Sequence, residues 1–182
     1  MPTPPHAATR YHPALVALHW LMVPLLLLAL VMGTFSLKEL PNASPDKIGA
    51  LRGHMIVGFT LGVLMLARLI TRLRSALPPP AAAGNAMQAW LAHGVHIGLY
   101  LAVFLMAASG AATAWQAGLP GIVFGASGAP LPETFSAFTP RLVHGLMAKL
   151  LTLLLVLHVA GALYHQWGMK DGLMSRMGFG RR

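Results

Sequence analysis

Two histidines lie fourteen residues apart in the last apolar stretch of this chain, His144 and His158. An α-helix turns by about 100° and rises by about 1.5 Å per residue, so these imidazoles would share a face about 21 Å apart along the axis. That spacing is most of the hydrocarbon thickness of a membrane, which is about 30 Å. One such helix could therefore hold two stacked cofactors, provided that other helices supply the partner ligands.

The composition predicts the elements that position these histidines. The 182 residues are 56% hydrophobic and 9% charged, with a mean hydropathy of +0.65, whereas soluble domains carry about 25% charged residues. Each of four apolar runs reaches the ~20 residues that a membrane-spanning helix needs. We therefore predict an all-α membrane protein, a single domain over residues 1–182 built as a four-helix bundle, with helices near 13–36, 51–73, 89–115 and 140–167.

The absence of cysteine limits the chemistry that such a bundle can hold. It excludes disulfides, thiolate metal sites, iron–sulfur clusters and covalent c-type haem attachment, all of which need cysteine sulfur. Any cofactor must therefore be held by histidine, methionine or oxygen ligands.

The net charge of +9 follows the expected topology and forms no nucleic-acid-binding patch. With four spans, both termini and the second connection share one side of the membrane. That side carries Arg10, Arg68, Arg72, Arg74, Lys170, Arg176, Arg181 and Arg182, and the other carries Lys38, Lys47, Arg52 and Arg141 beside Glu39, Asp46 and Glu133. The positive-inside rule then predicts that both termini are cytoplasmic, with membrane lipid and no nucleic acid as a partner.

The first span and the connections carry local signals. The first run is long, contains His19 and lacks an A-x-A cleavage site, so we expect a retained helix rather than a signal peptide. Ser44-Pro45-Asp46 suits the start of the second helix, and the prolines at 78–80 predict a stiff linker. The segment 116–139 is apolar but broken by glycine and proline, which favours a covering lid over a fifth span.

Four histidines at membrane depth pair by position. His19 lies near the cytoplasmic end of the first helix, and His54 lies near the external end of the second. Since the fourth helix runs inward, its first histidine is external and its second is cytoplasmic. Depth therefore pairs His54 with His144 and His19 with His158. Haem iron takes two axial imidazoles from opposing helices, whereas zinc prefers closed tetrahedral clusters. The alternative is that each imidazole hydrogen-bonds a neighbouring carbonyl group.

Several segments resemble the bacterial cytochrome b561 family. They are ALHWL, LRGHMIVGFTLGVLMLARLITRL, LAHGVHIGLYL, the H-x13-H pair and GALYHQWGMKDGLMSRM, which together cover about residues 10–180. The resemblance implies a four-helix, di-haem b-type cytochrome of the bacterial inner membrane that exchanges electrons with ubiquinone. It also implies that the axial ligands of the two b haems are His19 and His158 on the cytoplasmic side, and His54 and His144 on the periplasmic side. At least one member is similar to a superoxide oxidase, which passes electrons from external superoxide to quinone.

Other polar residues could serve these sites. Arg52 and Arg141 each lie within three residues of an external histidine, and could neutralise haem propionates or attract a small anion. The alternative for both is ordinary headgroup contact. Lys149 lies about 7–8 Å along the helix from His144, and a deep lysine is a functional candidate. The glycines that could let a flat macrocycle approach the backbone are Gly58, Gly62, Gly145 and Gly161.

Three further histidines lie near the cytoplasmic ends of the third and fourth helices, and they are candidates for a quinone site: His93, His96 and His165. They could donate to a quinone carbonyl and relay protons. Trp167, Lys170 and Asp171 would border this site. The alternative is that these side chains anchor the helices at the membrane interface.

The leading hypothesis is transmembrane electron transfer between an external donor and the quinone pool, with superoxide:ubiquinone oxidoreductase as its enzymatic form. A second hypothesis is a cytochrome b subunit that serves a periplasmic redox protein or a dehydrogenase. A remote third is a haem-free, histidine-lined transporter. Transporters often show internal repeats or broken helices near the midplane, and these features are absent from the sequence.

Overall fold

The computed structural model describes residues 10–79, 85–125 and 127–178. Its long helices are α1 (Pro13–Val31), α2 (Asp46–Arg74), α3 (Ala86–Gln116) and α4 (Thr139–Leu163). The shorter helical turns are η1 (Met32–Ser36), η2 (Pro120–Phe124), η3 (Tyr164–Met169) and η4 (Leu173–Met177). Within these described residues, four helical segments are apolar and long enough to cross a membrane. The predicted all-α, four-helix membrane fold is confirmed. The basic residues Arg181 and Arg182, the prediction for Pro80 and the first nine residues lie outside the described part.

Local sequence explains where the helices begin. Pro13 occupies the first turn of α1, where its missing N–H costs nothing. Asn85 caps α3, since its side chain accepts a hydrogen bond from the Gln88 N–H at 2.9 Å. α2 begins at Asp46 rather than near residue 51, because the Ser44 hydroxyl accepts the Asp46 N–H and the aspartate charge suits a helix N-terminus.

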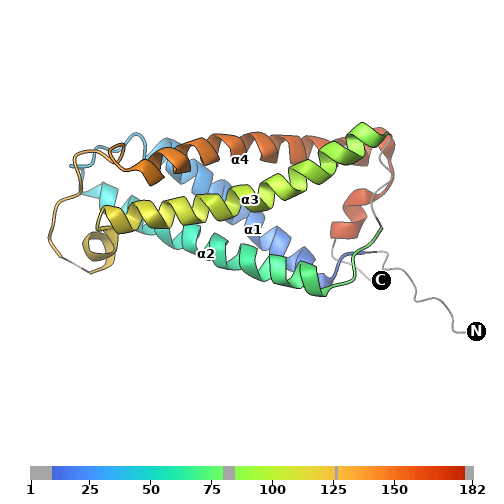
Figure 1. Ribbon diagram of the computed structural model, residues 1–182, viewed down its shortest axis with the longest axis horizontal. Helices are drawn as coiled ribbons and strands as arrows, with labels where there is room; N and C mark the ends of the chain where they lie inside the picture. The colour runs from blue at the N-terminus through green and yellow to red at the C-terminus, as the bar shows by residue number, and fades with distance from the viewer. Residues whose placement is uncertain (1–9, 80–84, 126, 179–182) are drawn as a thin grey trace, which may run out of the picture.

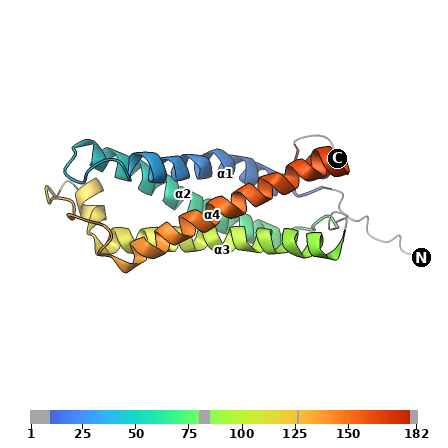
Figure 2. The same cartoon turned by 90° about the horizontal axis from the view of Figure 1, so that it is seen from above.

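The helices form an up-and-down bundle with two different ends (Figure 1). One end, the terminal end, carries the start of α1, the end of α2, the start of α3 and η4. The opposite end, the distal end, carries η1, η2 and the connections from α1 to α2 and from α3 to α4. α3 packs along α4, α1 along α2 and α2 along α3, whereas α4 approaches α1 and α2 much more loosely (Figure 2). Side chains that reach from α1 or α2 to α4 therefore cross loosely packed interfaces.

The middle of the bundle is apolar and closely packed. Its buried side chains come from all four helices: Met22, Leu61, Met65, Ala102, Val103 and Leu151. The outward faces are also apolar, as at Phe59, which is 76% exposed. Exposed apolar surface on this scale is unfavourable in water, so it is the lipid-facing surface of a membrane protein.

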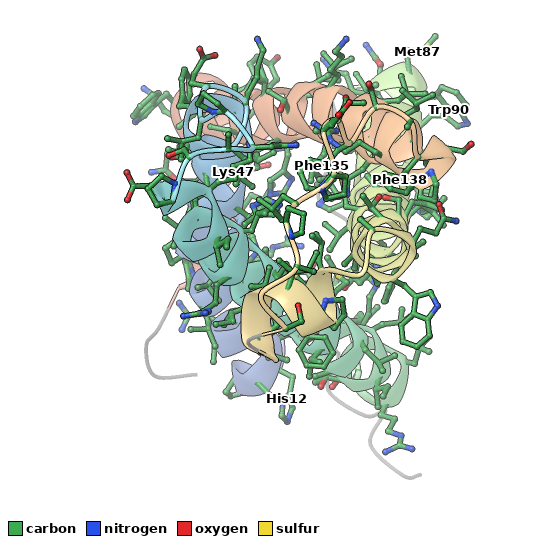
Figure 3. The ribbon with its side chains drawn as sticks, turned by 90° about the vertical axis from the view of Figure 1, so that its left-hand side faces the viewer. His12, Lys47, Met87, Trp90, Phe135 and Phe138 are labelled. Atoms are coloured by element: carbon green, nitrogen blue, oxygen red, sulfur yellow. The ribbon has the colours of Figure 1, made fainter. Side chains whose placement is uncertain are left out.

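The distal end is covered by the segment after α3. Val123 of η2 is buried in a second apolar cluster with Leu51 of α2, and Phe135 and Phe138 pack over the same cluster (Figure 3). Arg52 fixes η2 to α2, since its Nε and Nη2 both donate to the Val123 carbonyl at 3.1 and 2.7 Å. This segment lies over the bundle end as a covering element, as the glycines and prolines predict.

Candidate functional site

Two histidines from different helices meet in the distal half of the bundle. His54 of α2 and His144 of α4 are both half-buried, and their ring centres lie 6.1 Å apart with the planes at 77°. We call them the distal pair. The structure thus brings together the two residues that depth had paired.

Hydrogen bonds from neighbouring groups fix the orientation of the His144 imidazole. His144 Nδ1 lies 3.1 Å from the Met106 carbonyl oxygen and 3.3 Å from the Ser109 hydroxyl. A carbonyl only accepts, so Nδ1 carries the proton in this bond and Nε2 keeps a lone pair for a metal. His54 differs, because its Nδ1 is buried and has no hydrogen-bond partner among the described residues.

Two glycines that the sequence interpretation missed lie against these rings. A Cβ added at Gly110 of α3 would come 3.1 Å from His144 Cε1, and one at Gly33 of η1 would come 3.4 Å from His54 Cε1. The glycines predicted for this purpose have other surroundings. A Cβ would meet nothing within 4 Å at Gly58 or Gly161, Ala107 at Gly62 and the Arg141 guanidinium at Gly145.

The second pair lies in the terminal half. His19 of α1 and His158 of α4 have ring centres 6.1 Å apart with the planes at 74°, and we call them the terminal pair. A third imidazole joins them, since the His96 ring of α3 lies 5.3 Å from the His158 ring. His96 Nδ1 is bonded to the Ala92 carbonyl at 2.7 Å. Trp20 makes an edge contact with His19 at 5.3 Å.

The geometry of both pairs fits bis-imidazole haem. A metal–nitrogen bond of about 2 Å on each side, and about 1 Å more from nitrogen to ring centre, would place the ring centres about 6 Å apart. Both pairs have this spacing, and each lies between α4 and a helix that packs only loosely against it, α2 for the distal pair and α1 for the terminal pair. The Ala29 backbone lies near the buried His54 ring, and a ring with its Nδ1 proton turned to a carbonyl would keep Nε2 free for a metal, as in His144. In the described residues, no group of three or more histidine, aspartate or glutamate side chains is arranged to hold a metal ion alone.

The predicted cations differ in their relation to the distal pair. The Arg141 side chain runs along α4 and places its guanidinium beside Gly145, so its positive charge lies near both His54 and His144. Arg52 instead binds the covering segment. Lys149 is exposed on α4, without a hydrogen bond or ion pair to any described residue.

Lys47 was not singled out from the sequence, yet it is 4% exposed. Its Nζ donates to the Leu37 and Leu40 carbonyls at 2.5 and 2.6 Å, which ties the start of α2 to the end of the first span. A lysine next to an acidic residue in a polar connection gives no sequence signal of this burial.

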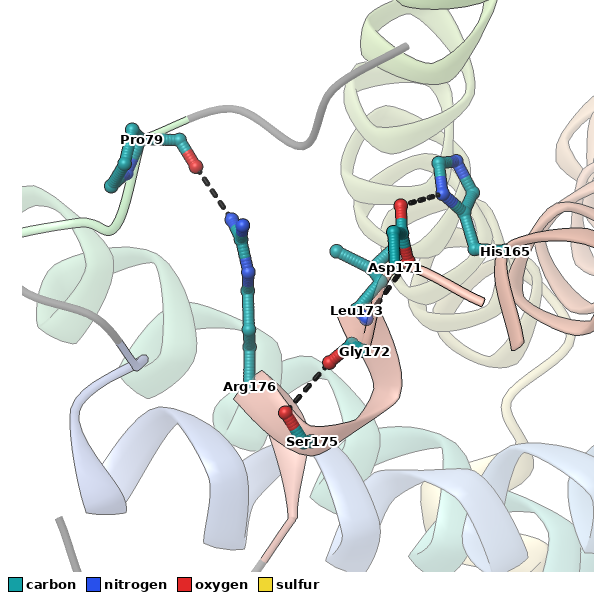
Figure 4. A network of polar contacts seen from close by, with 7 residues as sticks. All are labelled: Pro79, His165, Asp171, Gly172, Leu173, Ser175 and Arg176. Atoms are coloured by element: carbon teal, nitrogen blue, oxygen red, sulfur yellow. Dashed lines mark hydrogen bonds and ion pairs between the residues drawn. The ribbon is translucent and has the colours of Figure 1, made fainter. Parts of the chain in front are cut away.

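The three candidate quinone histidines have separate surroundings. His96 joins the terminal pair, and His93 is exposed. His165 Nδ1 lies 2.6 Å from Asp171 Oδ2, and Asp171 Oδ1 accepts the Leu173 N–H at 3.0 Å (Figure 4). The hydrogen bond from His165, followed by the one from Leu173, holds the pKa of the Asp171 carboxyl below its ordinary value of 3.8.

The segment after α4 is tied across the terminal end. Arg176 Nη1 donates to the Pro79 carbonyl at 2.7 Å, on the connection that follows α2 (Figure 4). Trp20 Nε1 donates to the Met177 carbonyl at 2.7 Å, and Arg10 Nε donates to the Ser175 carbonyl at 3.0 Å. The His165–Asp171 pair is therefore part of a folded cap on this end.

Comparison with known proteins agrees with this architecture. The chain is 27% identical over 177 residues to "Probable superoxide oxidase CybB" of Yersinia pestis, covering 92% of this chain and 95% of that protein. It is 29% identical over 166 residues to "Cytochrome b562" of Cereibacter sphaeroides, covering 89% and 90%. It is 27% identical over 175 residues to "Cytochrome b561 homolog 1" of Escherichia coli, covering 92% and 96%. Residues 10–180 match the family described as prokaryotic cytochrome b561, and the chain belongs to that family.

Proposed function

We propose that this chain carries electrons across the membrane through two haem b groups, one at each histidine pair. Membership of a cytochrome b family supports electron transport with haem in a multi-pass membrane protein. The observation that carries the finer proposal is the equal ring spacing of 6.1 Å in two pairs that share α4. When bound, haem b supplies an iron that accepts and releases one electron.

The chain's own groups hold and insulate these sites. The Met106 carbonyl orients His144 through Nδ1 and leaves its other nitrogen for the metal. Between the pairs, the apolar core around Leu61 and Leu151 excludes water. Arg141 adds positive charge near the distal pair, where it would favour the approach of an anion.

Charge supports the orientation, and the family and its named relatives support the partners. The positive-inside rule supports a cytoplasmic terminal end in the bacterial inner membrane, with the distal end facing the periplasm. Two superoxide ions would each lose one electron at the distal end and become two O₂ molecules. Ubiquinone would take both electrons and two protons near the terminal end. His165, bonded to Asp171, is the histidine best arranged there to donate to a quinone oxygen.

Haem counting tests the pairing. The wild type should hold two haems per chain in a reduced-minus-oxidised spectrum with haem assay. His54→Ala and His144→Ala should each lose one spectral component, and His19→Ala and His158→Ala should each lose the other. His93→Ala, at an exposed position of α3, is the matched control and should keep both. Retention of both haems in His19→Ala and in His54→Ala would refute the assignment.

A second measurement tests the donor. The purified single chain, supplied with superoxide and a soluble ubiquinone, should form quinol without any added protein. If quinol forms only after a periplasmic redox protein is added, the superoxide version of the proposal is wrong and the subunit alternative stands.

A further inference from the structure

A fourteen-residue spacing recurs on every helix of the bundle. It separates His19 from Gly33, His54 from Arg68, His96 from Gly110 and His144 from His158. The first span and α3 each place a glycine against a distal ring, and α3 places His96 against a terminal ring. Each helix thus gives one residue to a distal layer (Gly33, His54, Gly110 and His144) and one to a terminal layer (His19, Arg68, His96 and His158).

Two members of the terminal layer, His96 and Arg68, are not proposed ligands, and Arg68 is the charged one. It lies about 9 Å inside the end of α2, six residues before Arg74, which is the depth of His19 in α1. Its guanidinium reaches across to α1 one helical turn before His19, since Leu15 and His19 are four residues apart. Within the described residues its hydrogen bond runs from Nη1 to the Leu15 carbonyl at 2.6 Å.

The acidic side chains, all of which lie in the described residues, leave Arg68 without a counter-charge. The sequence has four acidic residues, and Glu39, Asp46 and Glu133 all lie at the distal end. Asp171, at the terminal end, is paired with His165, and this is the sole ion pair among the described residues. A guanidinium stays charged in a protein, and a charge at membrane depth is costly unless an anion pairs with it.

A polar neighbour shares this position. The Tyr100 hydroxyl is buried and lies close to the Arg68 guanidinium, although no hydrogen bond of ordinary geometry joins this hydroxyl to a described residue. Together the two groups offer N–H and O–H donors, which are the groups that bind an oxyanion. Arginine binds carboxylates in a bidentate manner.

We propose that Arg68, with Tyr100, binds a propionate carboxylate of the haem at the terminal pair. This inference rests on the proposed haem function. Arg68 is a positioning residue that acts on the carboxylate arm of the cofactor and not on the iron. Its positive charge also favours the reduced, less positive iron, so it raises the reduction potential of that site.

The test is a thermodynamic cycle in which Arg68 and the haem carboxylates are removed separately and together, and haem affinity is measured each time. Haem b and its dimethyl ester, which lacks the carboxylates, are titrated into the full-length protein in uncharged detergent. A His144→Ala background confines binding to the terminal pair. Arg68→Met should weaken haem b at least tenfold and leave the ester unchanged, while Arg68→Lys recovers part of the loss. Arg74→Met, at an exposed position of the same helix, should have no effect.

The reduction potential provides a second readout in the chain with both pairs intact. Arg68→Met should shift the one-electron equilibrium of the terminal haem about tenfold toward the oxidised form, which is about 59 mV. The distal haem should keep its potential. This readout does not depend on quinone turnover.

Three outcomes would overturn the inference. Equal weakening of haem b and ester by Arg68→Met would make Arg68 a structural residue that only holds the Leu15 carbonyl. An effect that appears in anionic lipid nanodiscs but not in uncharged detergent would assign Arg68 to a lipid phosphate. Wild-type protein that binds the ester as tightly as haem b would overturn it without any variant at Arg68. If the wild type instead takes up no haem, the proposed function itself fails.

Discussion

Gly110→Ala should weaken the distal haem site without damaging the helix that carries it. Gly110 faces His144, and an added Cβ would lie 3.1 Å from Cε1 and 3.3 Å from Nδ1. Ordinary contacts begin at 3.4 Å, so the ring must move by a few tenths of an ångström. The same ring is held by the Met106 carbonyl at 3.1 Å, and a shift strains this bond.

The magnitude follows from opposing terms. Overpacking of a closely packed site costs about 1–3 kcal/mol, and this cost falls on the haem-bound state, because a free ring can turn aside whereas a ring that holds iron cannot. Replacing a helical glycine by alanine returns about 1 kcal/mol of helix propensity, but this gain is equal with and without haem and so cancels from the affinity. At about 1.4 kcal/mol per tenfold, haem affinity at the distal pair should fall by about fivefold to about a hundredfold.

The assay is haem titration with a matched glycine on the same helix. Gly94→Ala places its Cβ where nothing lies within 4 Å, so it gains the same helix propensity and should bind haem as the wild type does. The terminal pair is the internal control in both variants. If Gly110→Ala and Gly94→Ala bind the distal haem equally, the contact with His144 does not position that ring and the reasoning is refuted.

Two further predictions concern the ends of the bundle. Lys47→Met should destabilise the protein by about 1–3 kcal/mol, because two carbonyls lose their buried donor. Lys38→Met, at an exposed position, is the control. Equal thermal unfolding of the two variants would contradict a stabilising role for Lys47. The Asp171 carboxyl has a lowered folded pKa, so its contribution to the terminal cap is present above its ordinary value of 3.8 and is lost as the pH falls through the folded value. The protection factors of the backbone amides at 173–177, which correct for slower intrinsic exchange in acid, should fall in the wild type as the pH is lowered. Asp171→Asn should lack this step because it has no carboxylate to protonate, and an unchanged step in Asp171→Asn would argue against the role of Asp171.

The sequence predicts the bundle because membrane burial leaves few choices. Runs of about 20 apolar residues in lipid must be helices, since each backbone group needs an internal partner. Depth along four antiparallel spans then predicts which histidines can meet, and the rings of both predicted pairs lie 6.1 Å apart. Depth is one coordinate, however, and it does not say which way a side chain faces around its helix.

The direction in which each side chain faces around its helix explains which contacts the sequence did not predict. His93 and His96 are less than one helical turn apart, but only His96 contacts His158. Arg52 is two residues from a distal histidine and Arg141 is three, but Arg52 turns to the covering segment instead. Gly110 carries no side chain, so no chemistry drew attention to it. Packing of α3 along α4 decides the outcomes for His96 and Gly110, and packing of η2 against α2 decides the one for Arg52; both are contacts between residues far apart in the chain.

The repeated fourteen-residue spacing links this packing to the sites. Fourteen residues of an ideal helix fall about 40° short of four full turns, a drift of about 20° per heptad. On straight, parallel helices, two residues with this spacing could not both point at one axis. Helices that cross at an angle can compensate for the drift. Figures 1 and 2 show that α3 and α4 cross at an angle. The same register on all four helices therefore ties the two layers to one bundle geometry. The two layers differ in their residues that are not proposed ligands, which are Gly33 and Gly110 in the distal layer and Arg68 and His96 in the terminal layer. Two sites with the same histidine spacing thus differ in charge and polarity. In the proposed two-haem function, this difference would give the chain a means to set two reduction potentials on one repeated framework.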